Sequence, residues 1–390
     1  MTGNRRDFIW QSFASVAGLT ASGIIPSAEF ARGLNNTSYP EEIVIKPEKK
    51  PAPAESIRFS VIGLNHDHIY GMISALIGGG GKLVAVYSKE ADLLQVFLKR
   101  YPDVKVAKSE AEILGDNSIQ LVASASIPVD RAPLGLRVMQ SGKDYMTDKP
   151  GILTLEQLDE VKRVQKQTKR IYSIMYSERF GNPAAVQAGE FVRSGAIGKV
   201  VQTIGLGPHR MRPESRPDWF FDPDKAGGIL CDIGSHQSDQ FLFYTGSREA
   251  EVNFAQIGNF NTSEYSRYQD FGDMSVRSPH ATGYIRIDWF TPDGLNTWGD
   301  GRMFILGTEG YIELRKYADI AGREGGNHLF LVDRKETKYY NCTNVHMPYG
   351  EQLVSDVVNR TETAMTQDHC FLATELALKA QKMAFKITGV

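Results

Sequence analysis

The stretch "FSVIGLNHDHIYG", Phe59 to Gly71, decides the fold. An apolar strand runs into Gly63, and a helical pattern follows, which is how a dinucleotide-binding βαβ unit opens. The glycine pattern G-x-G-x-x-G would also require glycines at the positions of Asn65 and His68. The turn is therefore either a dinucleotide-binding turn with altered contacts or an H-x-H metal site at a strand end.

The metal alternative depends on His66 and His68. An H-x-H pair at the end of a first strand is typical of some metal-dependent hydrolase barrels, which contain eight βα units. The C-terminal half of this chain does not supply those units, so we predict no metal here. We expect the two histidines to cap the helix, and we expect His68 to be able to donate to a phosphate.

Charge and composition exclude some classes of partner. The 390 residues carry 44 basic and 46 acidic side chains, a formal net charge of -2, which gives no field to attract nucleic acid or an anionic membrane. The length favours two domains. The three cysteines are too few for a disulfide framework and allow at most one bridge.

The N-terminus has the pattern of an export signal. Arg5 and Arg6 precede a weakly apolar stretch and then small residues, an order that resembles a twin-arginine (Tat) signal over residues 1–32. The apolar run is too short to span a bilayer. We therefore expect a periplasmic or otherwise exported protein. Residues 33–56, rich in Pro, Lys and Glu, are interpreted as a linker.

Two different patterns of secondary structure are predicted after the linker. Short apolar strands alternate with amphipathic helices over residues 57–177, which predicts a doubly wound parallel sheet. In this half, Thr154 and Gln157 form the pattern of a capping box. Residues 178–390 contain a run of strands with helices at its ends, which predicts an α+β domain with an open, mainly antiparallel sheet. The exposed face of that sheet could form a homo-oligomer interface.

Two motifs carry the chemistry. "YMTDKPG" places Asp148, Lys149 and Pro150 at a strand end, where ligands of open α/β sheets bind. "GGILCDIGSHQSDQ" places Asp232, His236 and Asp239 at spacings that share one helix face.

These two motifs, in this order, resemble the Gfo/Idh/MocA family, which includes glucose-fructose oxidoreductase and inositol dehydrogenase. The EKP motif of that family appears as Asp148-Lys149-Pro150, and its GGxxxDxGxHxxD motif is intact from Gly227 to Asp239. The resemblance covers nearly the whole chain after the linker. It implies an N-terminal Rossmann domain, a C-terminal α/β domain, and an NAD- or NADP-dependent enzyme that acts on sugars or cyclic polyols.

Three residues are the predicted catalytic set. A neutral imidazole at His236 suits the role of the base that takes the hydroxyl proton. Lys149 can stabilise the developing alkoxide. Asp232 could orient the imidazole or hold a neighbouring substrate hydroxyl. The family resemblance implies the same roles.

The predicted cofactor site combines the first turn with the ends of later strands. Ser88 and Lys89 stand where an acidic residue would bind the ribose of NAD, which favours NADP or relaxed choice, although a shift of one residue would bring Glu90 into the site. The full predicted set is Gly63, Asn65, His66, His68, Ser88, Lys89, Ser126, Pro128, Asp148 and Lys149.

The substrate site should draw on the second half of the chain, where aromatic faces and hydrogen-bond donors suit a sugar. The predicted residues are Tyr176, Arg179, His209, Trp219, Asp232 and His236. A family histidine that precedes one of the helices is replaced by Arg131, with a small expected consequence.

Three functions remain open from sequence. The first is an exported sugar oxidoreductase with tightly bound cofactor, because an exported enzyme meets little free NAD(P). The second is a redox-neutral glycosidase, lyase or epimerase that acts through a keto-sugar. The third is a non-catalytic carbohydrate-binding protein.

Overall fold

The computed structural model describes residues 40–47 and 53–387 of the chain. The predicted Tat signal lies outside these residues. Among the helices that the model describes, none combines the length and the apolar character needed to cross a membrane.

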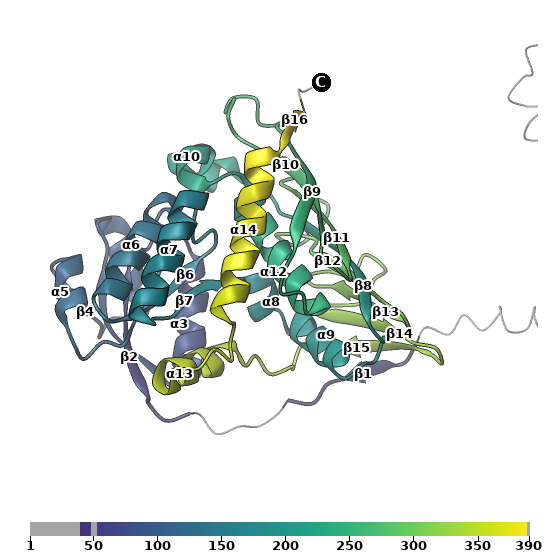
Figure 1. Cartoon of the computed structure of the whole chain (residues 1–390), viewed down its shortest axis with the longest axis horizontal. Coiled ribbons are helices and arrows are strands. Elements are labelled where there is room, and N and C mark those ends of the chain that lie inside the picture. The colour runs from purple at the N-terminus through teal and green to yellow at the C-terminus, as the bar shows by residue number, and fades with distance from the viewer. Residues whose placement is uncertain (1–39, 48–52, 388–390) are drawn as a thin grey trace, which may run out of the picture. The chain divides into compact units, whose positions relative to one another are not determined.

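The first sheet is parallel and six-stranded, with the order β4-β3-β2-β5-β6-β7. Figure 1 shows helices α6 and α7 side by side next to it. This is the strand order of a dinucleotide-binding sheet, and it reverses between β2 and β5, where ligands of doubly wound folds bind. Its central strands β5 and β6 are buried along their whole length, as expected for a sheet covered on both faces. The strands are β2 (Ile57–Ile62), β3 (Gly81–Tyr87), β4 (Lys105–Val106), β5 (Leu121–Ser124), β6 (Asp144–Asp148) and β7 (Tyr172–Met175).

Helices connect these strands. α6 and α7 pack against each other, and α3 packs against a helix from the C-terminal part of the chain. The Thr154 hydroxyl accepts a hydrogen bond from the Gln157 N–H at 3.1 Å, which confirms the predicted N-cap. The helices are α3 (His68–Gly78), α4 (Ala91–Arg100), α5 (Glu110–Gly115), α6 (Pro128–Gln140) and α7 (Leu155–Thr168).

The second sheet has ten strands in the order β1-β15-β14-β13-β12-β8-β11-β10-β9-β16. Most neighbours are antiparallel; the pairs β1/β15, β8/β11 and β9/β16 are parallel. The strands are β1 (Glu42–Val44), β8 (Val200–Pro208), β9 (Glu251–Gly258), β10 (Phe271–Arg277), β11 (Thr282–Asp288), β12 (Arg302–Gly307), β13 (Tyr311–Arg315), β14 (His328–Val332), β15 (Thr337–Asn341) and β16 (Phe385–Ile387).

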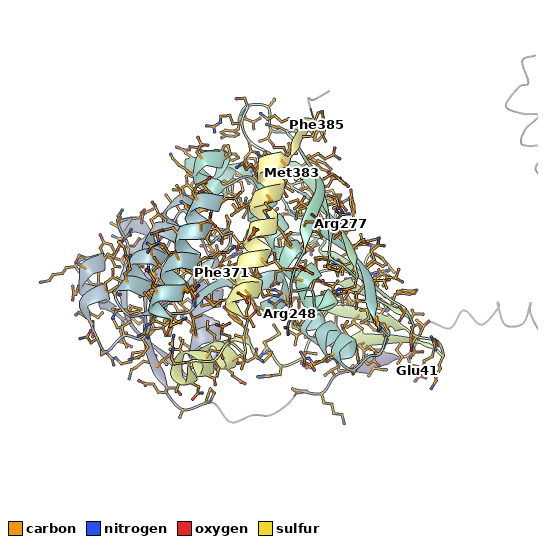
Figure 2. All side chains as sticks on the ribbon, in the orientation of Figure 1. Glu41, Arg248, Arg277, Phe371, Met383 and Phe385 are labelled. Carbon is orange, nitrogen blue, oxygen red and sulfur yellow. The ribbon has the colours of Figure 1, made fainter. Side chains whose placement is uncertain are left out.

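One helix joins the two sheets. α14 packs against β9 of the second sheet and against the neighbouring helix α12. It also packs against β7 of the first sheet and against helix α7. Figure 2 shows Phe371 on α14, and its ring lies 6.3 Å from the ring of Tyr172 on β7. Buried apolar residues of the first sheet and of β9, β10 and β11 therefore form one continuous core, whereas those of β12, β13 and β14 form a second cluster. The remaining helices are α8 (Ser177–Phe180), α9 (Pro183–Arg193), α10 (Pro223–Ala226), α11 (Ile229–Asp232), α12 (Gly234–Thr245), α13 (Tyr349–Asn359) and α14 (Gln367–Met383), with 3₁₀ turns at Pro213–Ser215 and Asp218–Phe221.

The predicted fold class, a Rossmann sheet followed by an open and mostly antiparallel sheet, is confirmed. One part of the predicted linker differs, because Glu42–Val44 forms β1 and pairs with β15. The three cysteines are buried and free. The chain passes from the first sheet to the second between Met175 and Val200, and the exact boundary near residue 177 stays a prediction.

Candidate active site

A cleft of about 160 Å³ lies at the carboxyl ends of the first sheet's strands and is closed by loops of the second half. Two larger hollows, of about 530 and 600 Å³, contain none of the predicted site residues. We therefore place the candidate site in the smaller cleft. It is lined by His66, His68, Pro128, Arg131, Lys149, His209, Arg216, Trp219, Phe220, Ala226, Asp232, Trp289 and Trp298.

The turn after β2 needs glycine at its first position. Gly63 has φ +84°, and a Cβ atom on it would lie 1.9 Å from the Ser126 hydroxyl oxygen. The Gly63 N–H donates to the Tyr87 carbonyl at 2.9 Å, which ties the turn to the end of β3. Gly63 and Ser126 are thus in close contact at the switch point of the sheet, where the sequence predicts the cofactor.

The end of β3 carries an acidic side chain that the predicted set left out. The Ser88 hydroxyl donates to the Glu90 carboxylate at 2.8 Å, while Lys89 is exposed. Burial alone would raise the pKa of Glu90, but hydrogen bonds from Asn65 and Ser88 lower it. The carboxylate is therefore charged, and it lies beside the altered turn.

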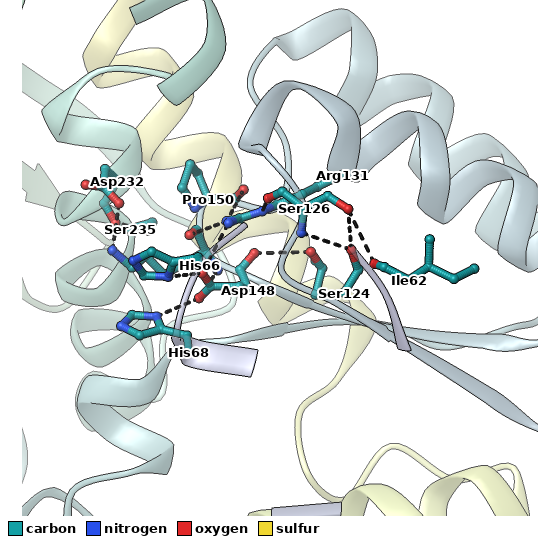
Figure 3. Close-up of polar contacts among 12 residues, drawn as sticks. Ile62, His66, His68, Ser124, Ser126, Arg131, Asp148, Pro150, Asp232 and Ser235 are labelled. Carbon is teal, nitrogen blue, oxygen red and sulfur yellow. Dashed lines mark hydrogen bonds and ion pairs between the residues drawn. The ribbon is translucent and has the colours of Figure 1, made fainter. Parts of the chain in front are cut away.

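Asp148 holds both histidines of the turn (Figure 3). The Nδ1 atoms of His66 and His68 lie 2.8 Å from different oxygens of the buried Asp148 carboxylate. The expected capping role is wrong, because Asp67 occupies the N-cap position of α3 without a side-chain cap hydrogen bond. The three side chains each bring one possible metal-ligating atom within 4.8 Å of the others.

Arg131 reaches the same carboxylate from α6. Its side chain is buried; it donates to Asp148 at 3.2 Å, to the Ser126 carbonyl at 2.7 Å and to the Pro150 carbonyl at 3.2 Å. Arg131 therefore links the loop after β5 to the loop after β6. One buried guanidinium satisfies acceptors on two loops at once, and the small consequence expected from this replacement stays a prediction.

Charge also fixes the protonation states of this cluster. Burial would raise the pKa of Asp148, but His68, Arg131 and His66 outweigh it and hold the pKa well below its usual range. Burial and the neighbouring His68 lower the pKa of His66 to about 4, against the opposing effect of Asp148. At neutral pH, Asp148 is thus a carboxylate and His66 a neutral imidazole.

Lys149 and Asp232 form the central ion pair of the cleft. The Lys149 ammonium lies 2.6 Å from an Asp232 carboxylate oxygen, so the two predicted catalytic residues meet across 83 positions of sequence. Burial would raise the pKa of Asp232, but Lys149 outweighs this and lowers it. An ammonium held in this way is pre-oriented toward whatever oxygen binds in the cleft.

The second motif does not present one continuous helix face to the cleft. The helix is interrupted at Ile233, between α11 and α12, and Asp232 alone of the three polar residues lines the cleft. His236 is buried behind it, and its Nδ1 has no hydrogen-bond partner. Burial lowers the pKa of His236 to about 3, so the imidazole is neutral.

Two predicted substrate residues are instead structural. Arg179 is buried and makes a two-pronged ion pair with Asp239, at 2.7 and 2.6 Å, which also accepts from His369 at 2.8 Å. The Tyr176 hydroxyl lies 3.0 Å from the Thr374 hydroxyl on α14. These predictions are wrong, because both side chains are consumed by partners inside the core.

His209 and Trp219 do line the cleft. His209 packs edge-on against Trp289 and Trp298, with ring centroids 5.3 and 4.7 Å apart, and burial lowers its pKa to about 4. Sequence reasoning missed both tryptophans and also Arg216, whose guanidinium lies 4.6 Å from the Phe220 ring centroid. The position of Trp289 directly after β11 is the signal that could have found it.

Comparison with known proteins agrees with this architecture. Residues 57–176 match the profile "Oxidoreductase family, NAD-binding Rossmann fold", and residues 185–313 match "GFO/IDH/MocA C-terminal domain". The crystal structure of a protein from Erwinia carotovora atroseptica SCRI1043, assigned to the oxidoreductases, superposes with a TM-score of 0.83. It is 46% identical, over 85% of this chain and 100% of that one.

Two further relatives have named activities. The scyllo-inositol 2-dehydrogenase (NADP(+)) of Bacillus subtilis strain 168 is 28% identical over 45% of this chain, which spans about half (49%) of the length of that relative. A levoglucosan dehydrogenase in complex with NADH and L-sorbose is 16% identical over 84% of this chain and 97% of that one, with a TM-score of 0.68. At that identity the likeness shows the fold alone.

Proposed function

Because the chain belongs to the Gfo/Idh/MocA family of NAD(P)-dependent oxidoreductases, we propose that it transfers a hydride to or from a secondary hydroxyl of a sugar or cyclic polyol. The observation that carries the proposal is the Lys149–Asp232 pair, at 2.6 Å, in a cleft at the carboxyl ends of a Rossmann sheet. Oxidoreductase activity follows from the family, and the substrate class is the proposal.

The turn and the neighbouring strand ends fit a dinucleotide. Gly63 leaves the space of a missing Cβ at the switch point, and the charged Glu90 carboxylate offers acceptors for ribose hydroxyls at the end of β3. Asn65 is bonded to Glu90 and so lies at the ribose side of the turn. Gly63, Asn65, Ser88 and Glu90 would hold the cofactor, which supplies a hydride acceptor or donor when it is bound.

The side chains of the cleft divide the remaining work. Lys149 can donate a hydrogen bond to the reacting oxygen and stabilise negative charge as it develops there. Asp232 holds the ammonium in place and keeps a second carboxylate oxygen available for a neighbouring hydroxyl. His236 remains the predicted base: it is buried, its imidazole is neutral, and the charge of Lys149 acts on it.

The walls of the cleft suit a polyhydroxylated ring. Trp219, Trp289 and Trp298 bring aromatic surface, and His209 and Arg216 bring polar groups to the same walls. Aromatic faces pack well on the apolar side of a sugar, and the polar groups can bind its hydroxyls. The named activity of the Bacillus subtilis relative, on scyllo-inositol, supports this choice of substrate class.

The experiment is a substrate screen followed by three variants. The purified full chain is incubated with NAD or NADP and with scyllo-inositol, levoglucosan, D-glucose or D-xylose, and reduced nicotinamide is followed by absorbance. We expect turnover of at least one probe, a loss of about 10³-fold or more in kcat/KM for Lys149→Met, and a smaller loss for Asp232→Asn. The control is Lys379→Met on the exposed part of α14. Unchanged turnover by Lys149→Met would contradict the proposal.

We further propose that the protein is exported by the twin-arginine route with its cofactor already bound. This is supported by the sequence pattern of Arg5 and Arg6 and by the scarcity of free NAD(P) outside the cytoplasm. Protein purified from the periplasm of an expressing bacterium should release about one equivalent of NAD(H) or NADP(H) on denaturation, identified by mass spectrometry. Replacing both arginines with lysine should abolish export, and recovery of the protein only in the cytoplasm would contradict the proposed route.

A further inference from the structure

Arg216 brings a positive charge to the cleft. It lies between the two 3₁₀ turns, Pro213–Ser215 and Asp218–Phe221, and its side chain borders the cleft. Among the residues that the structure describes, no carboxylate lies within ion-pair distance of its guanidinium, and its buried Nε atom has no hydrogen-bond partner. A buried donor on a charged group is costly to leave unsatisfied, so an acceptor on a bound molecule would be favoured at this place.

Two aromatic rings hold the guanidinium in position. Its central carbon lies 4.6 Å from the ring centroid of Phe220 and 5.2 Å from that of Trp289, and both rings also border the cleft. Contacts of this kind orient the flat guanidinium without satisfying the hydrogen-bond donors at its edge. Arg216 is therefore pre-organised for a flat acceptor with two oxygens, which is the shape of a carboxylate.

A second unsatisfied donor lies beside the same rings. Tyr268 is 8% exposed, its hydroxyl has no hydrogen-bond partner among the described residues, and its ring centroid lies 5.6 Å from that of Phe220. It borders a small hollow of about 20 Å³ that shares Phe220, Asp232 and Trp289 with the cleft. Burial raises the pKa of Tyr268, so the hydroxyl keeps its proton and can donate it to a hydrogen bond. Arg216 and Tyr268 thus bring two free donors to one part of the cleft.

The other arginine and the lysine of the cleft already have acidic partners. Lys149 pairs with Asp232 at 2.6 Å, and Arg131 pairs with Asp148 at 3.2 Å. Among the arginine and lysine side chains that the structure places at the cleft, Arg216 therefore leaves one uncompensated positive charge. A single carboxylate would balance this charge, whereas a phosphate group, with about −1.5 to −2 charges at neutral pH, would require a second free cation.

We propose that the substrate is an acidic sugar, a polyhydroxylated ring with one carboxylate as in a hexuronic acid, and that Arg216 binds the carboxylate with a further hydrogen bond from Tyr268. This inference rests on the proposed function and narrows its substrate class. The carboxylate takes no part in the hydride transfer; its binding fixes the ring in the cleft that also contains Lys149. The aromatic walls of the cleft remain available to the apolar side of the ring.

The first test compares matched ligands that differ in one group. The methyl glycosides of glucose, galactose and mannose, and those of the corresponding uronic acids, are titrated by calorimetry into the full chain with reduced cofactor. We expect at least one uronide to bind about tenfold or more tightly than its neutral partner, because a hydrogen-bonded charge pair forms with the carboxylate alone. Equal or weaker binding by the uronide in every pair would overturn the proposal, as would tighter binding of the matching 6-phosphate.

Three variants test the two donors. Arg216→Gln should lower the preference for the uronide over its neutral partner by about tenfold or more, and Arg216→Lys, which keeps the charge but not the fork, should lower it less. Tyr268→Phe should lower the preference by about threefold and leave the midpoint of urea unfolding unchanged, because its hydroxyl has no partner to lose among the described residues.

Arg212→Gln is the matched control for the charge. Arg212 lies on the same loop, is exposed and does not line the cleft, so its replacement should leave the preference unchanged. If Arg216→Gln keeps the preference for the uronide, or weakens the binding of the cofactor instead, the assignment of Arg216 to a substrate carboxylate is wrong.

Binding and turnover together separate the inference from its premise. If neutral sugars are turned over and no uronide is bound more tightly or oxidised with a higher kcat/KM, the proposed function stands and the inference is wrong. If uronides bind through Arg216 but neither acidic nor neutral probes are turned over, the carboxylate site stands and the proposed function is contradicted. The absence of both binding and turnover would contradict both.

Discussion

At the scale of single residues, Glu90 sets the expected choice of cofactor. Its carboxylate is fixed by Ser88 and Asn65 at the end of β3. A carboxylate in this place accepts hydrogen bonds from the ribose 2'-hydroxyl of NAD and repels the 2'-phosphate of NADP. We therefore expect NAD to be preferred, in contrast to the NADP or relaxed choice predicted from Ser88 and Lys89.

The variant Glu90→Gln tests this preference. It should raise the ratio of kcat/KM with NADP to kcat/KM with NAD by about tenfold, which corresponds to ~1.4 kcal/mol. The measurement is steady-state kinetics with both cofactors, and Glu190→Gln on the surface of α9 is the control. A ratio that does not change, or that moves toward NAD, would show that Glu90 does not face the ribose.

The sequence alone identifies those site residues that belong to a recognisable local motif. Lys149 and Asp232 were found because each lies in a recognisable stretch, and the structure brings them together. The role of Trp298 was not predictable because its partner His209 lies far away in the chain, and that of Arg131 because it depends on how two loops meet. Glu90 entered the prediction only through a possible shift of one residue, although its partner Ser88 lies two positions away. Arg179 was wrongly assigned because nothing in the sequence shows that Asp239 would pair with it.

At the scale of elements, the turn between β2 and α3 tolerates no side chain at its first position. Gly63→Ala would place a methyl group 1.9 Å from the Ser126 hydroxyl oxygen, at a φ of +84°. The left-handed backbone conformation alone costs an alanine about 1–2 kcal/mol, and the clash of its methyl group with Ser126 adds to this cost. We expect a loss of about 2 kcal/mol or more in the unfolding free energy, measured by urea denaturation, together with weaker NAD binding.

Gly71, in the helix that follows the turn, is the matched control. It is exposed in α3, and an added Cβ would meet nothing within 4 Å. Gly71→Ala should therefore be neutral or stabilise the protein by up to ~1 kcal/mol, because alanine has the higher helix propensity. Equal destabilisation by both substitutions would mean that the contact with Ser126 is not what requires glycine at position 63.

The strands of the first sheet were predictable because each is a short buried apolar run between polar helices. β4 was not, since Lys105–Val106 is a two-residue edge strand without such a run. β1 was not, because its partner strand β15 is 297 positions away in sequence, as in the pair Glu42 and Tyr339. Edge strands of this kind depend on tertiary pairing and leave little local pattern.

At the scale of the whole molecule, three neutral histidines make the fold sensitive to acid. Burial lowers the pKa of His66 and His209 to about 4 and that of His236 to about 3, from 6.5. Below pH 6.5 the unfolded chain binds protons that the folded chain does not, so the unfolding free energy falls with pH until the folded pKa is reached. For a folded pKa of 4 the loss at pH 5 is about 2 kcal/mol per imidazole.

Urea denaturation at pH 7 and pH 5 measures this loss. The wild type should lose several kcal/mol between the two values, and His209→Gln should lose about 2 kcal/mol less than the wild type does. Carboxylates with lowered pKa values, such as Asp239 at about 2, keep their contribution through this window and lose it only at lower pH. Equal unfolding free energies at pH 7 and pH 5 would contradict the burial of neutral imidazoles.

The outer face of the second sheet is the place where we expect a homo-oligomer to form. Leu306 on β12 and Tyr311 on β13 are directly paired across the two strands and are 44% and 40% exposed. Large apolar side chains that share a sheet face in this way favour an interface. Light scattering should show an oligomer for the wild type and a smaller species for the double variant Leu306→Lys/Tyr311→Lys. Val96→Lys on α4 is the control, and a monomeric wild type would contradict the expectation.

The most direct measurement is isotope transfer in the cleft. The full chain, with oxidised cofactor, is given a polyol from the substrate screen that carries deuterium on its carbinol carbons, and the nicotinamide is then analysed by mass spectrometry. If the Lys149–Asp232 cleft is the site of hydride transfer, the wild type places one deuterium on the nicotinamide and Lys149→Met places almost none. Bound cofactor that acquires no deuterium from any probe, or equal transfer by Lys149→Met, would contradict the assignment of this cleft as the active site.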